Sequence, residues 1–238
     1  MNIAIIGYGK MGKEIEKVAR EKGHQIPLII DIHNQEDLNK KNLEKVDVAI
    51  EFTTPQSVIQ NLYQCFEADV PVVTGSTGWN DKKEEVENHC RTNGKTLFHA
   101  SNFSIGVNVL FKLNEYLAKL MNNLEQYNVE IEETHHTQKL DSPSGTAITL
   151  TTSLISNIER KKDWEENTKN QADMLNIIAK RIENVFGIHT IRYESDVDTI
   201  ELTHSAKSRK GFASGAVIAA EFIQGKTGVF NMNDVLQF

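Results

Sequence analysis

Two histidines, a lysine and an expected helix start fall within twelve residues of this 238-residue chain. His135 and His136 follow an alternating run that is typical of a strand, and Lys139 comes three residues after them. Ser144 then precedes a stretch with helical spacing, so we expect it to cap a helix over 147–158. A helix start offers backbone N–H groups to a carboxylate, an ammonium adds a positive charge, and imidazoles exchange protons near neutral pH. The segment therefore predicts an anion-binding site that contains acid–base groups.

Two other interpretations of this segment stay open. A histidine pair can bind zinc, although neither a cysteine nor a third ligand stands at the usual spacing from His135 and His136. Alternatively, the segment is an exposed polar loop followed by an ordinary capped helix. The convergence of two imidazoles, one ammonium and one helix start favours the anion site.

A second motif stands near residue 1. The run of β-formers Asn2–Ile6 leads directly into the glycine-rich segment Gly7–Gly12, helical spacing continues to about Gly23, and a second apolar run over 26–30 closes on Asp31. Strand, GxGxxG, helix, strand and acid form the dinucleotide-binding arrangement, in which the glycines let the backbone approach a pyrophosphate. The alternative is a tight strand-to-helix turn that only needs small residues.

Asp31 also bears on which dinucleotide would bind. A carboxylate here accepts hydrogen bonds from the ribose hydroxyls and repels a 2′-phosphate, and Ile32 supplies no compensating cation. Lys40 and Lys41 are close in sequence but are expected in the next helix. The sequence therefore favours NADH and leaves NADPH open.

The first hundred residues supply a scaffold for this motif. Apolar runs over 2–6, 26–30, 46–52, 70–73 and 95–99 alternate with helical segments, which include 56–68 and a helix that extends from an Asn80 cap to residue 93. Such alternation predicts a Rossmann-type α/β fold with a doubly wound parallel sheet, in which ligands bind at the carboxyl ends of the strands. The exit turns at Thr53, Gly75–Thr77 and Ala100–Phe103 are expected at that edge, and generic loop chemistry is the alternative for each of them.

The pattern changes from about Gly106 onwards. The expected elements are a long helix over 107–124, a strand over 128–133, helical spacing over 174–182, and antiparallel strands over 190–195 and 199–206. Residues 157–175 are highly charged, which predicts a solvated helix or loop. We expect a dinucleotide-binding domain over residues 1–105 and 216–238, with a last helix over 215–225, and an α+β substrate-binding and oligomerisation domain over 106–215.

Composition and charge exclude several classes of protein. There are 26 basic and 33 acidic side chains, so the net charge is −7, which argues against a nucleic-acid-binding or membrane-surface protein. The longest apolar runs are far shorter than a spanning helix needs, and MNIAIIGYG shows no export signal. Cys65 and Cys90 are not in a CxxC pair. These features predict a cytoplasmic protein with reduced thiols.

His135, His136, Lys139, Asp141 and the run Pro143–Ala147 have the residue types and spacing of a known signature. They resemble the signature of the 4-hydroxy-tetrahydrodipicolinate reductase (dihydrodipicolinate reductase) family, nicotinamide enzymes of the diaminopimelate route to lysine. The chain departs from the family pattern in having Lys10 for the usual arginine, Gln138 for a basic residue or histidine, and Ile6 where the glycine turn commonly begins. The segments that carry the resemblance appear in family order, and they are Gly9–Gly12, Glu51–Thr53, Thr74–Gly78, Asn102–Asn108, the run His135-His136-x-x-Lys139-x-Asp141-x-Pro143-Ser144-Gly145-Thr146-Ala147, Gly187–His189, Ser208–Arg209, Phe212–Ala216 and Gly228–Leu236.

The resemblance implies roles for individual residues. The implied cofactor-binding residues are Gly7, Tyr8, Gly9, Lys10, Met11, Gly12, Asp31, Gly75, Ser76, Thr77, Ala100, Ser101, Asn102 and Phe103. His135 and Lys139 are the implied catalytic residues, and the substrate's two carboxylates are received by His136, Lys139, Ser144, Gly145 and Thr146. It further implies NADH or NADPH as cofactor, no metal, and a homotetramer.

The implied reaction reduces a cyclic dicarboxylate. Its hydroxylated ring loses water, hydride adds at the carbon that carried the hydroxyl, and Lys139 or His135 supplies a proton. Closure of the two domains would exclude water. Two other functions stay open. A catalytically silent NAD-binding regulator would leave the histidine–lysine site without a purpose, and another nicotinamide enzyme, such as an amino-acid or semialdehyde dehydrogenase, would share only the first domain.

Overall fold

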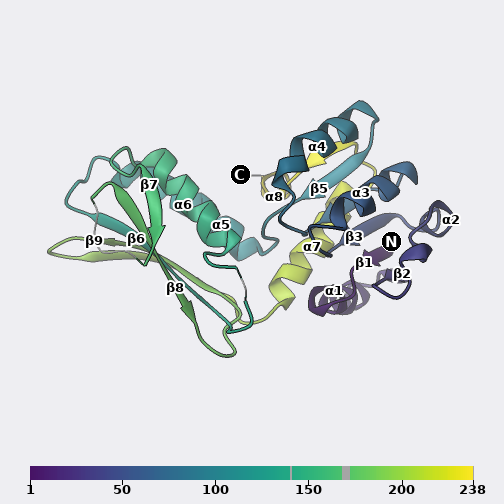
Figure 1. Ribbon diagram of the computed structural model, residues 1–238, viewed down its shortest axis with the longest axis horizontal. Coiled ribbons are helices and arrows are strands. Elements are labelled where there is room, and N and C mark those ends of the chain that lie inside the picture. The colour runs from purple at the N-terminus through teal and green to yellow at the C-terminus, as the bar shows by residue number, and fades with distance from the viewer. Residues whose placement is uncertain (140, 168–171, 238) are drawn as a thin grey trace. The chain divides into compact units, whose positions relative to one another are not determined.

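The computed structural model describes residues 1–139, 141–167 and 172–237, and the chain divides into two compact units (Figure 1). Unit 1 contains Met1–Ile105 and Arg209–Phe238, and unit 2 contains Gly106–Ser208. Two clusters of buried apolar side chains lie in unit 1 and one in unit 2. Among the described residues, no helix has the length and apolar character needed to cross a membrane.

The sheet of unit 1 is parallel throughout and runs in the order β11-β5-β4-β3-β1-β2. Because the chain goes from β1 to β2 on one side and then to β3 on the other, the strand order reverses between β1 and β3. In such folds a ligand crevice opens at the carboxyl ends of the strands beside the reversal. The strands are β1 (Asn2–Ile6), β2 (Gln25–Ile30), β3 (Val48–Glu51), β4 (Val72–Thr74), β5 (Thr96–His99) and β11 (Gly228–Phe230).

Helices cover both faces of this sheet, which confirms the predicted doubly wound fold. On one face, α1 and α7 bury Ile15 and Val217 against side chains that include Ile5. On the other, α3 and α4 bury Leu62 and Val86. The helices are α1 (Lys10–Glu21), α2 (Lys40–Leu43), α3 (Val58–Glu67), α4 (Lys83–Thr92), α7 (Lys210–Ile223) and α8 (Met232–Leu236), with 3-10 turns at Gln35–Asp37 and Asn80–Lys82.

Some predicted boundaries in unit 1 are wrong. Asn80 does not cap α4, because a 3-10 turn precedes the helix and neither element has a side-chain cap. Trp79 anchors this turn instead, since its buried indole N–H donates to the Ser76 carbonyl at 2.8 Å. Helix α7 begins at Lys210 rather than 215. Strand β11 and helix α8 were not predicted.

Unit 2 has a mixed sheet in the order β10-β9-β6-β8-β7, and helices α5 (Ile105–Met121) and α6 (Gly145–Asn157) contribute to its core. Leu110 and Leu150 from these helices are buried with Ile131 and Ile191 of the sheet. The predicted antiparallel pairing of the last two strands is confirmed. The strands are β6 (Asn128–His135), β7 (Asp163–Glu166), β8 (Met174–Arg181), β9 (Ile188–Glu194) and β10 (Thr199–Ser205).

The helix predicted over 174–182 is wrong, because this segment is strand β8. Its apolar residues suit either period, and parallel pairing with β6 on one side and β7 on the other decides in favour of a strand. The alternate residues Leu175 and Ile177 are fully buried. Strand β7 lies within the charged stretch for which a helix or loop was predicted, and residues 168–171 of that stretch are outside the described residues. The β6–β8 pairing aligns Arg181 with His135.

Candidate functional site

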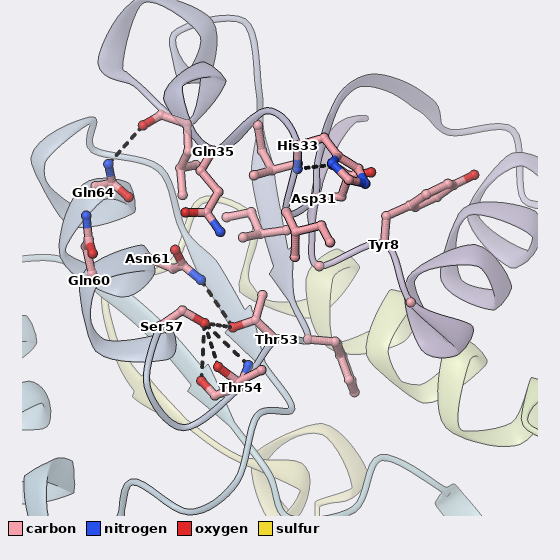
Figure 2. A pocket seen from close by; sticks show the side chains of 17 residues that line it. Tyr8, Asp31, His33, Gln35, Thr53, Thr54, Ser57, Gln60, Asn61 and Gln64 are labelled. Carbon is pink, nitrogen blue, oxygen red and sulfur yellow. Dashed lines mark hydrogen bonds between the residues drawn. The ribbon is translucent and has the colours of Figure 1, made fainter.

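A cavity of about 630 Å³ opens in unit 1 where the strand order reverses (Figure 2). This volume is typical of small-molecule and cofactor sites. The cavity lies at the carboxyl ends of β1, β2 and β3, with α3 along one side. Its lining residues are Ile6, Gly7, Tyr8, Gly9, Ile30, Asp31, Ile32, His33, Gln35, Leu38, Phe52, Thr53, Thr54, Ser57, Gln60, Asn61 and Gln64.

The three motif glycines differ in what surrounds them. A Cβ at Gly7 would lie 2.1 Å from the Phe52 carbonyl oxygen, and one at Gly12 would lie 2.1 Å from the Gly7 carbonyl oxygen. Gly7 also has a φ of +96°, which side chains rarely adopt. A Cβ at Gly9 would meet nothing within 4 Å. The fold therefore requires Gly7 and Gly12, whereas Gly9 leaves open space on the cavity wall, as a close-lying phosphate would need.

Asp31 projects from the end of β2 at the rim of this cavity (Figure 2). Its carboxylate accepts a hydrogen bond from the His33 backbone N–H at 2.7 Å. The Asp31 backbone N–H donates to the side-chain oxygen of Asn34 at 2.8 Å. The turn thus holds the carboxylate in place. None of the residues that the structure places along the cavity wall is a lysine or an arginine. Lys40 and Lys41 lie in α2, as predicted, and do not line the cavity.

A buried carboxylate joins the exit turns of β3 and β4. Glu51 is fully buried and accepts hydrogen bonds from the Thr53 N–H at 3.1 Å, the Thr74 hydroxyl at 2.5 Å and the Ser76 hydroxyl at 3.1 Å. The Ser76 hydroxyl in turn accepts the Thr53 N–H at 2.7 Å. Phe52 lies between these turns and the next one, because its ring is 5.6 Å from that of Phe103. The predicted convergence of the three exit turns at one edge is therefore confirmed.

Only part of the predicted cofactor set lines the cavity. Gly7, Tyr8, Gly9 and Asp31 do, and Ile6 lines it as well. Sequence reasoning missed the polar side chains that α3 and its N-cap residue contribute, because the surface of a helix gives no motif that would identify them. These are Ser57 at the N-cap and Gln60, Asn61 and Gln64 in the helix. The predicted residues that do not line it are Lys10, Met11, Gly12, Gly75, Ser76, Thr77, Ala100, Ser101, Asn102 and Phe103.

The second group of predicted residues gathers in unit 2, at the end of β6 and the start of α6. Ser144 is the N-cap of α6, as predicted, and its hydroxyl accepts the Ala147 N–H at 3.2 Å. His135 is buried at the end of β6, and His136 is half-buried. The Lys139 ammonium lies 2.8 Å from both carboxylate oxygens of Asp141. Gly145 is exposed, a Cβ there would meet nothing within 4 Å, and Thr146 is buried.

Two residues that the sequence analysis left without a role complete this cluster. Glu133 on β6 is fully buried, and His189 on β9 is nearly so. The His189 Nε2 lies 3.2 Å from the Ser144 hydroxyl and 3.6 Å from the Glu133 carboxylate. Glu133 precedes His135 by two residues and so shares its face of the strand, which is the signal that could have identified it. His189 is 54 residues beyond His135, and only the β6–β9 pairing brings the two rings within 5.0 Å.

This cluster holds a negative carboxylate beside a neutral imidazole. Burial alone would raise the pKa of Glu133, but hydrogen bonds from His189 and Ser144 and the proximity of His135 lower it to about 2. Burial is the main cause that lowers the pKa of His135 to about 4, and His189 contributes in the same direction. At neutral pH His135 is therefore uncharged and can accept a proton.

The same cluster contains a possible metal-ligand set. Glu133, His135 and His189 bring three potential ligand atoms within 4.8 Å of one another, so the third ligand that the sequence did not reveal comes from a distant strand. Two imidazoles and a carboxylate suit Zn²⁺ and similar cations. The guanidinium of Arg181 lies 3.5 Å from the same carboxylate and opposes a further positive charge.

Comparison with known proteins covers both units. The family model described as dihydrodipicolinate reductase, N-terminus, matches residues 1–103, and the model described as dihydrodipicolinate reductase, C-terminus, matches residues 106–236. The chain belongs to the dihydrodipicolinate reductase family. It is 48% identical over 238 residues to the 4-hydroxy-tetrahydrodipicolinate reductase of Christiangramia forsetii. This alignment covers 99% of this chain and 98% of the relative. It is 33% identical over 228 residues to the enzyme of that name from Neisseria meningitidis serogroup B, covering 93% and 83%.

A solved structure shares the fold of this dihydrodipicolinate reductase family member. Dipicolinate-bound dihydrodipicolinate reductase from Paenisporosarcina sp. TG-14 aligns with a TM-score of 0.77 and 24% identity, over 97% of each chain. The predicted family and the predicted class of nicotinamide-dependent oxidoreductase are confirmed by the family membership. The alternative of a different nicotinamide enzyme, with an unrelated second domain, is excluded by the match over residues 106–236.

The lowered pKa of His135 predicts a dependence of stability on pH. The folded pKa, about 4, lies below the ordinary value of 6.5, so the folded state resists protonation that the unfolded state accepts. The stabilisation is complete above pH 6.5 and is lost as the pH falls from there towards 4. Between pH 7 and pH 5 we expect the wild type to lose on the order of 1–2 kcal/mol more unfolding free energy than His135→Asn, measured by urea denaturation. Equal losses would contradict a neutral buried His135.

Proposed function

We propose that this chain reduces 4-hydroxy-tetrahydrodipicolinate to tetrahydrodipicolinate with NADH or NADPH, in the diaminopimelate route to lysine. The observation that carries the proposal is the gathering of His135, Lys139 and the Ser144-capped start of α6 in unit 2. A dinucleotide-binding unit alone would suit many functions. The second cluster adds acid–base groups and an anion site, which a silent NAD-binding regulator would not use.

The cavity of unit 1 supplies the proposed cofactor site. Gly7 and Gly9 line it, and the open space at Gly9 fits a pyrophosphate close to the backbone. The start of α1 at Lys10 follows directly and presents N–H groups to an anion. The Asp31 carboxylate would accept hydrogen bonds from the hydroxyls of the adenosine ribose. The exit turns at Gly75–Thr77 and Ala100–Phe103 are assigned to the nicotinamide half, and the Glu51 network supports this assignment because it fixes Ser76 next to Thr53.

We favour NADH over NADPH as the cofactor. Asp31 offers a carboxylate where the adenosine ribose would lie, and a 2′-phosphate beside it would be repelled. No lysine or arginine occurs among the residues that are described as lining this cavity. A 2′-phosphate would therefore lack the basic partner that it usually has.

The two carboxylates of the substrate are assigned to the start of α6 and its neighbours. Gly145 and Thr146 are the first residues of the helix, where backbone N–H groups and the helix dipole favour an anion. Because a Cβ at Gly145 would meet nothing within 4 Å, the chain leaves room for a ligand there. His136 and Lys139 add hydrogen-bond donors beside it.

Lys139 is the proposed proton donor. A reduced nicotinamide bound in unit 1 would supply the hydride for the ring carbon that lost its hydroxyl as water. The pair of electrons displaced towards the ring nitrogen then takes a proton from the Lys139 ammonium, which is returned to its charged form by water. The Asp141 carboxylate holds this ammonium in the free protein. Because His135 is uncharged at neutral pH, we assign it a hydrogen bond to the substrate rather than the donation of the proton.

We further propose that the protein is a homotetramer. Helix α5 exposes a row of apolar side chains spaced three or four residues apart, namely Val109, Leu113, Tyr116 and Leu120. A contiguous apolar row on a helix marks a surface that another chain covers. The family resemblance supports four subunits.

The cytoplasm is the proposed location. Cys65 and Cys90 are both free and buried, and burial raises the pKa of each thiol. Such thiols are inert and suit a reducing compartment. The reduced nicotinamide that the reaction consumes is also supplied there.

Substitution of Lys139 tests the proposed reaction. With freshly prepared 4-hydroxy-tetrahydrodipicolinate and NADH, we expect Lys139→Ala to lower kcat by about 10²–10⁴-fold, followed as loss of nicotinamide absorbance. The matched control is Lys180→Ala, a lysine of the same unit that pairs with Glu132 on the sheet. Wild-type protein that binds NADH without consuming it would overturn the proposed function, and full activity in Lys139→Ala would remove this lysine from the chemistry.

The contrast between two glycines tests the cofactor site. Gly9→Ala should keep wild-type stability, because its Cβ enters open space, but should weaken NADH binding about 10-fold or more by crowding the pyrophosphate. Gly12→Ala should destabilise the fold by about 1–3 kcal/mol, because its Cβ would overlap the Gly7 carbonyl. Urea unfolding and fluorescence titration with NADH separate the two effects. Unchanged NADH affinity in Gly9→Ala would contradict the assignment.

Assembly can be tested at the apolar row of α5. The wild type should sediment with the mass of four chains, and Leu113→Glu should sediment as a smaller species because a charge is placed on the row. Glu115→Lys, a charge change on the same helix beside its partner Lys119, serves as the control. A wild type that sediments as a single chain would contradict the tetramer.

A further inference from the structure

Glu133 is a fully buried carboxylate for which the proposed reaction has no direct use. It lies on β6, two residues before His135, and its partners come from three other segments. The Ser144 N–H donates to both carboxylate oxygens, at 3.1 and 3.2 Å. His189 Nε2 lies at 3.6 Å, and the Arg181 guanidinium at 3.5 Å. A carboxylate buried at such a cost in solvation, inside a cluster of functional groups, calls for a role in that cluster.

One side of the carboxylate faces His135. The His135 Nδ1 lies 3.6 Å from Oε2 of Glu133, and this nitrogen has no hydrogen-bond partner among the described residues. A carboxylate accepts hydrogen bonds only, so it favours the tautomer that carries the proton on Nδ1. The separation is slightly longer than a hydrogen bond, as is common before a ligand is bound. In this tautomer, Nε2 keeps its lone pair.

Gly187 lies against the Nε2 side of the His135 ring and leaves more room there than a residue with a side chain would. A Cβ at this position would lie 3.2 Å from Nε2 of His135 and 3.8 Å from the His189 ring, and the φ of Gly187 is +151°. The backbone here is one that side chains rarely adopt. The carboxylate and the glycine thus act on opposite nitrogens of one imidazole. Glu133 orients Nδ1, and Gly187 leaves room at Nε2.

The other side of the carboxylate holds the start of α6. The Ser144 N–H is fixed on Glu133, while the Ser144 hydroxyl caps Ala147 and contacts His189 at 3.2 Å. These contacts set the position of the residues that follow Ser144 at the helix start. Arg181 extends the link, because its guanidinium also donates to the Asp141 carbonyl at 2.8 Å. One carboxylate therefore ties β6, β8 and β9 to the loop and helix that carry the proposed substrate groups.

We infer that Glu133 is a positioning residue for the reduction: its carboxylate sets the tautomer of His135 and the place of the α6 start, so that an imidazole lone pair and the helix N–H groups face the same bound diacid. This inference rests on the proposed function for its substrate. Its content concerns this chain's own residues, and the tautomer can be measured without any ligand.

The first test is made on the wild-type protein. Nitrogen-15 NMR of histidine-labelled protein at pH 7, with His135 assigned by comparison with His135→Asn, should show a protonated Nδ1 and a bare Nε2 in the absence of ligand. A proton on Nε2 instead would overturn the inference. Because this measurement needs only folded wild type, it remains decisive even if a Glu133 variant does not fold.

The second test is Glu133→Gln, whose amide keeps the shape but loses the charge and can donate a hydrogen bond. We expect kcat to fall about 10–100-fold, as for the hydrogen-bond partners of other functional histidines, while the KM for NADH stays unchanged. The pH dependence of kcat should shift, and the Nδ1 resonance of His135 should lose its protonated character. Glu132→Gln is the matched control, since Glu132 is the next glutamate on β6 but is only half-buried and pairs with Lys180.

The outcomes separate the inference from the proposed function. A folded Glu133→Gln with wild-type kcat, pH profile and tautomer would overturn the positioning role and leave the reaction untouched. A loss of unfolding free energy alone, with kcat unchanged, would assign Glu133 a structural role only and would also overturn it. Wild type with no turnover, but with the expected tautomer, would overturn the function and retain the arrangement of Glu133 and His135.

Discussion

The arrangement of unit 2 depends on one buried interaction, the acceptance of the Ser144 N–H by the Glu133 carboxylate. This interaction fixes the start of α6 to β6, the strand that carries His135. Burial raises the pKa of this carboxyl, but hydrogen bonds from His189 and Ser144 and the proximity of His135 lower it to about 2. The His135 ring beside it has a pKa of about 4 and is uncharged at neutral pH.

Unit 1 shows the same division between groups that serve the fold and groups that serve a ligand. In unit 1 the buried carboxylate is Glu51, which accepts hydrogen bonds from the exit turns of β3 and β4 as Glu133 does from the start of α6. Gly7 and Gly12 are required by the backbone around them, whereas no described residue would lie within 4 Å of a Cβ at Gly9. When a glycine is unnecessary for packing and lines a cavity, a ligand is the simplest reason for it.

Much of this could be predicted from the sequence, where local pattern and tertiary context agree. The central strands of unit 1, β1, β3, β4 and β5, are largely buried and flanked by turn residues, so their apolar runs are unambiguous. Ser144 is a cap whose signal is local. Prediction fails where pairing partners are distant. The segment Met174–Arg181 has helical spacing in isolation and becomes a strand because β6 and β7 lie on either side. His189 was given no role for the same reason, since only the pairing of β6 with β9 brings it to Glu133. The polar residues of α3 on the cavity wall carry no motif.

A small diacid is proposed to bind at the start of α6 beside His135 and Lys139. The most direct measurement is a crystal structure of the protein with NADH and pyridine-2,6-dicarboxylate, a stable planar diacid. One carboxylate of the diacid should accept the backbone N–H groups that follow Ser144, with the Lys139 ammonium turned from Asp141 towards the ligand. A diacid bound away from α6, or an ammonium that remains on Asp141 with the ligand in place, would contradict the account.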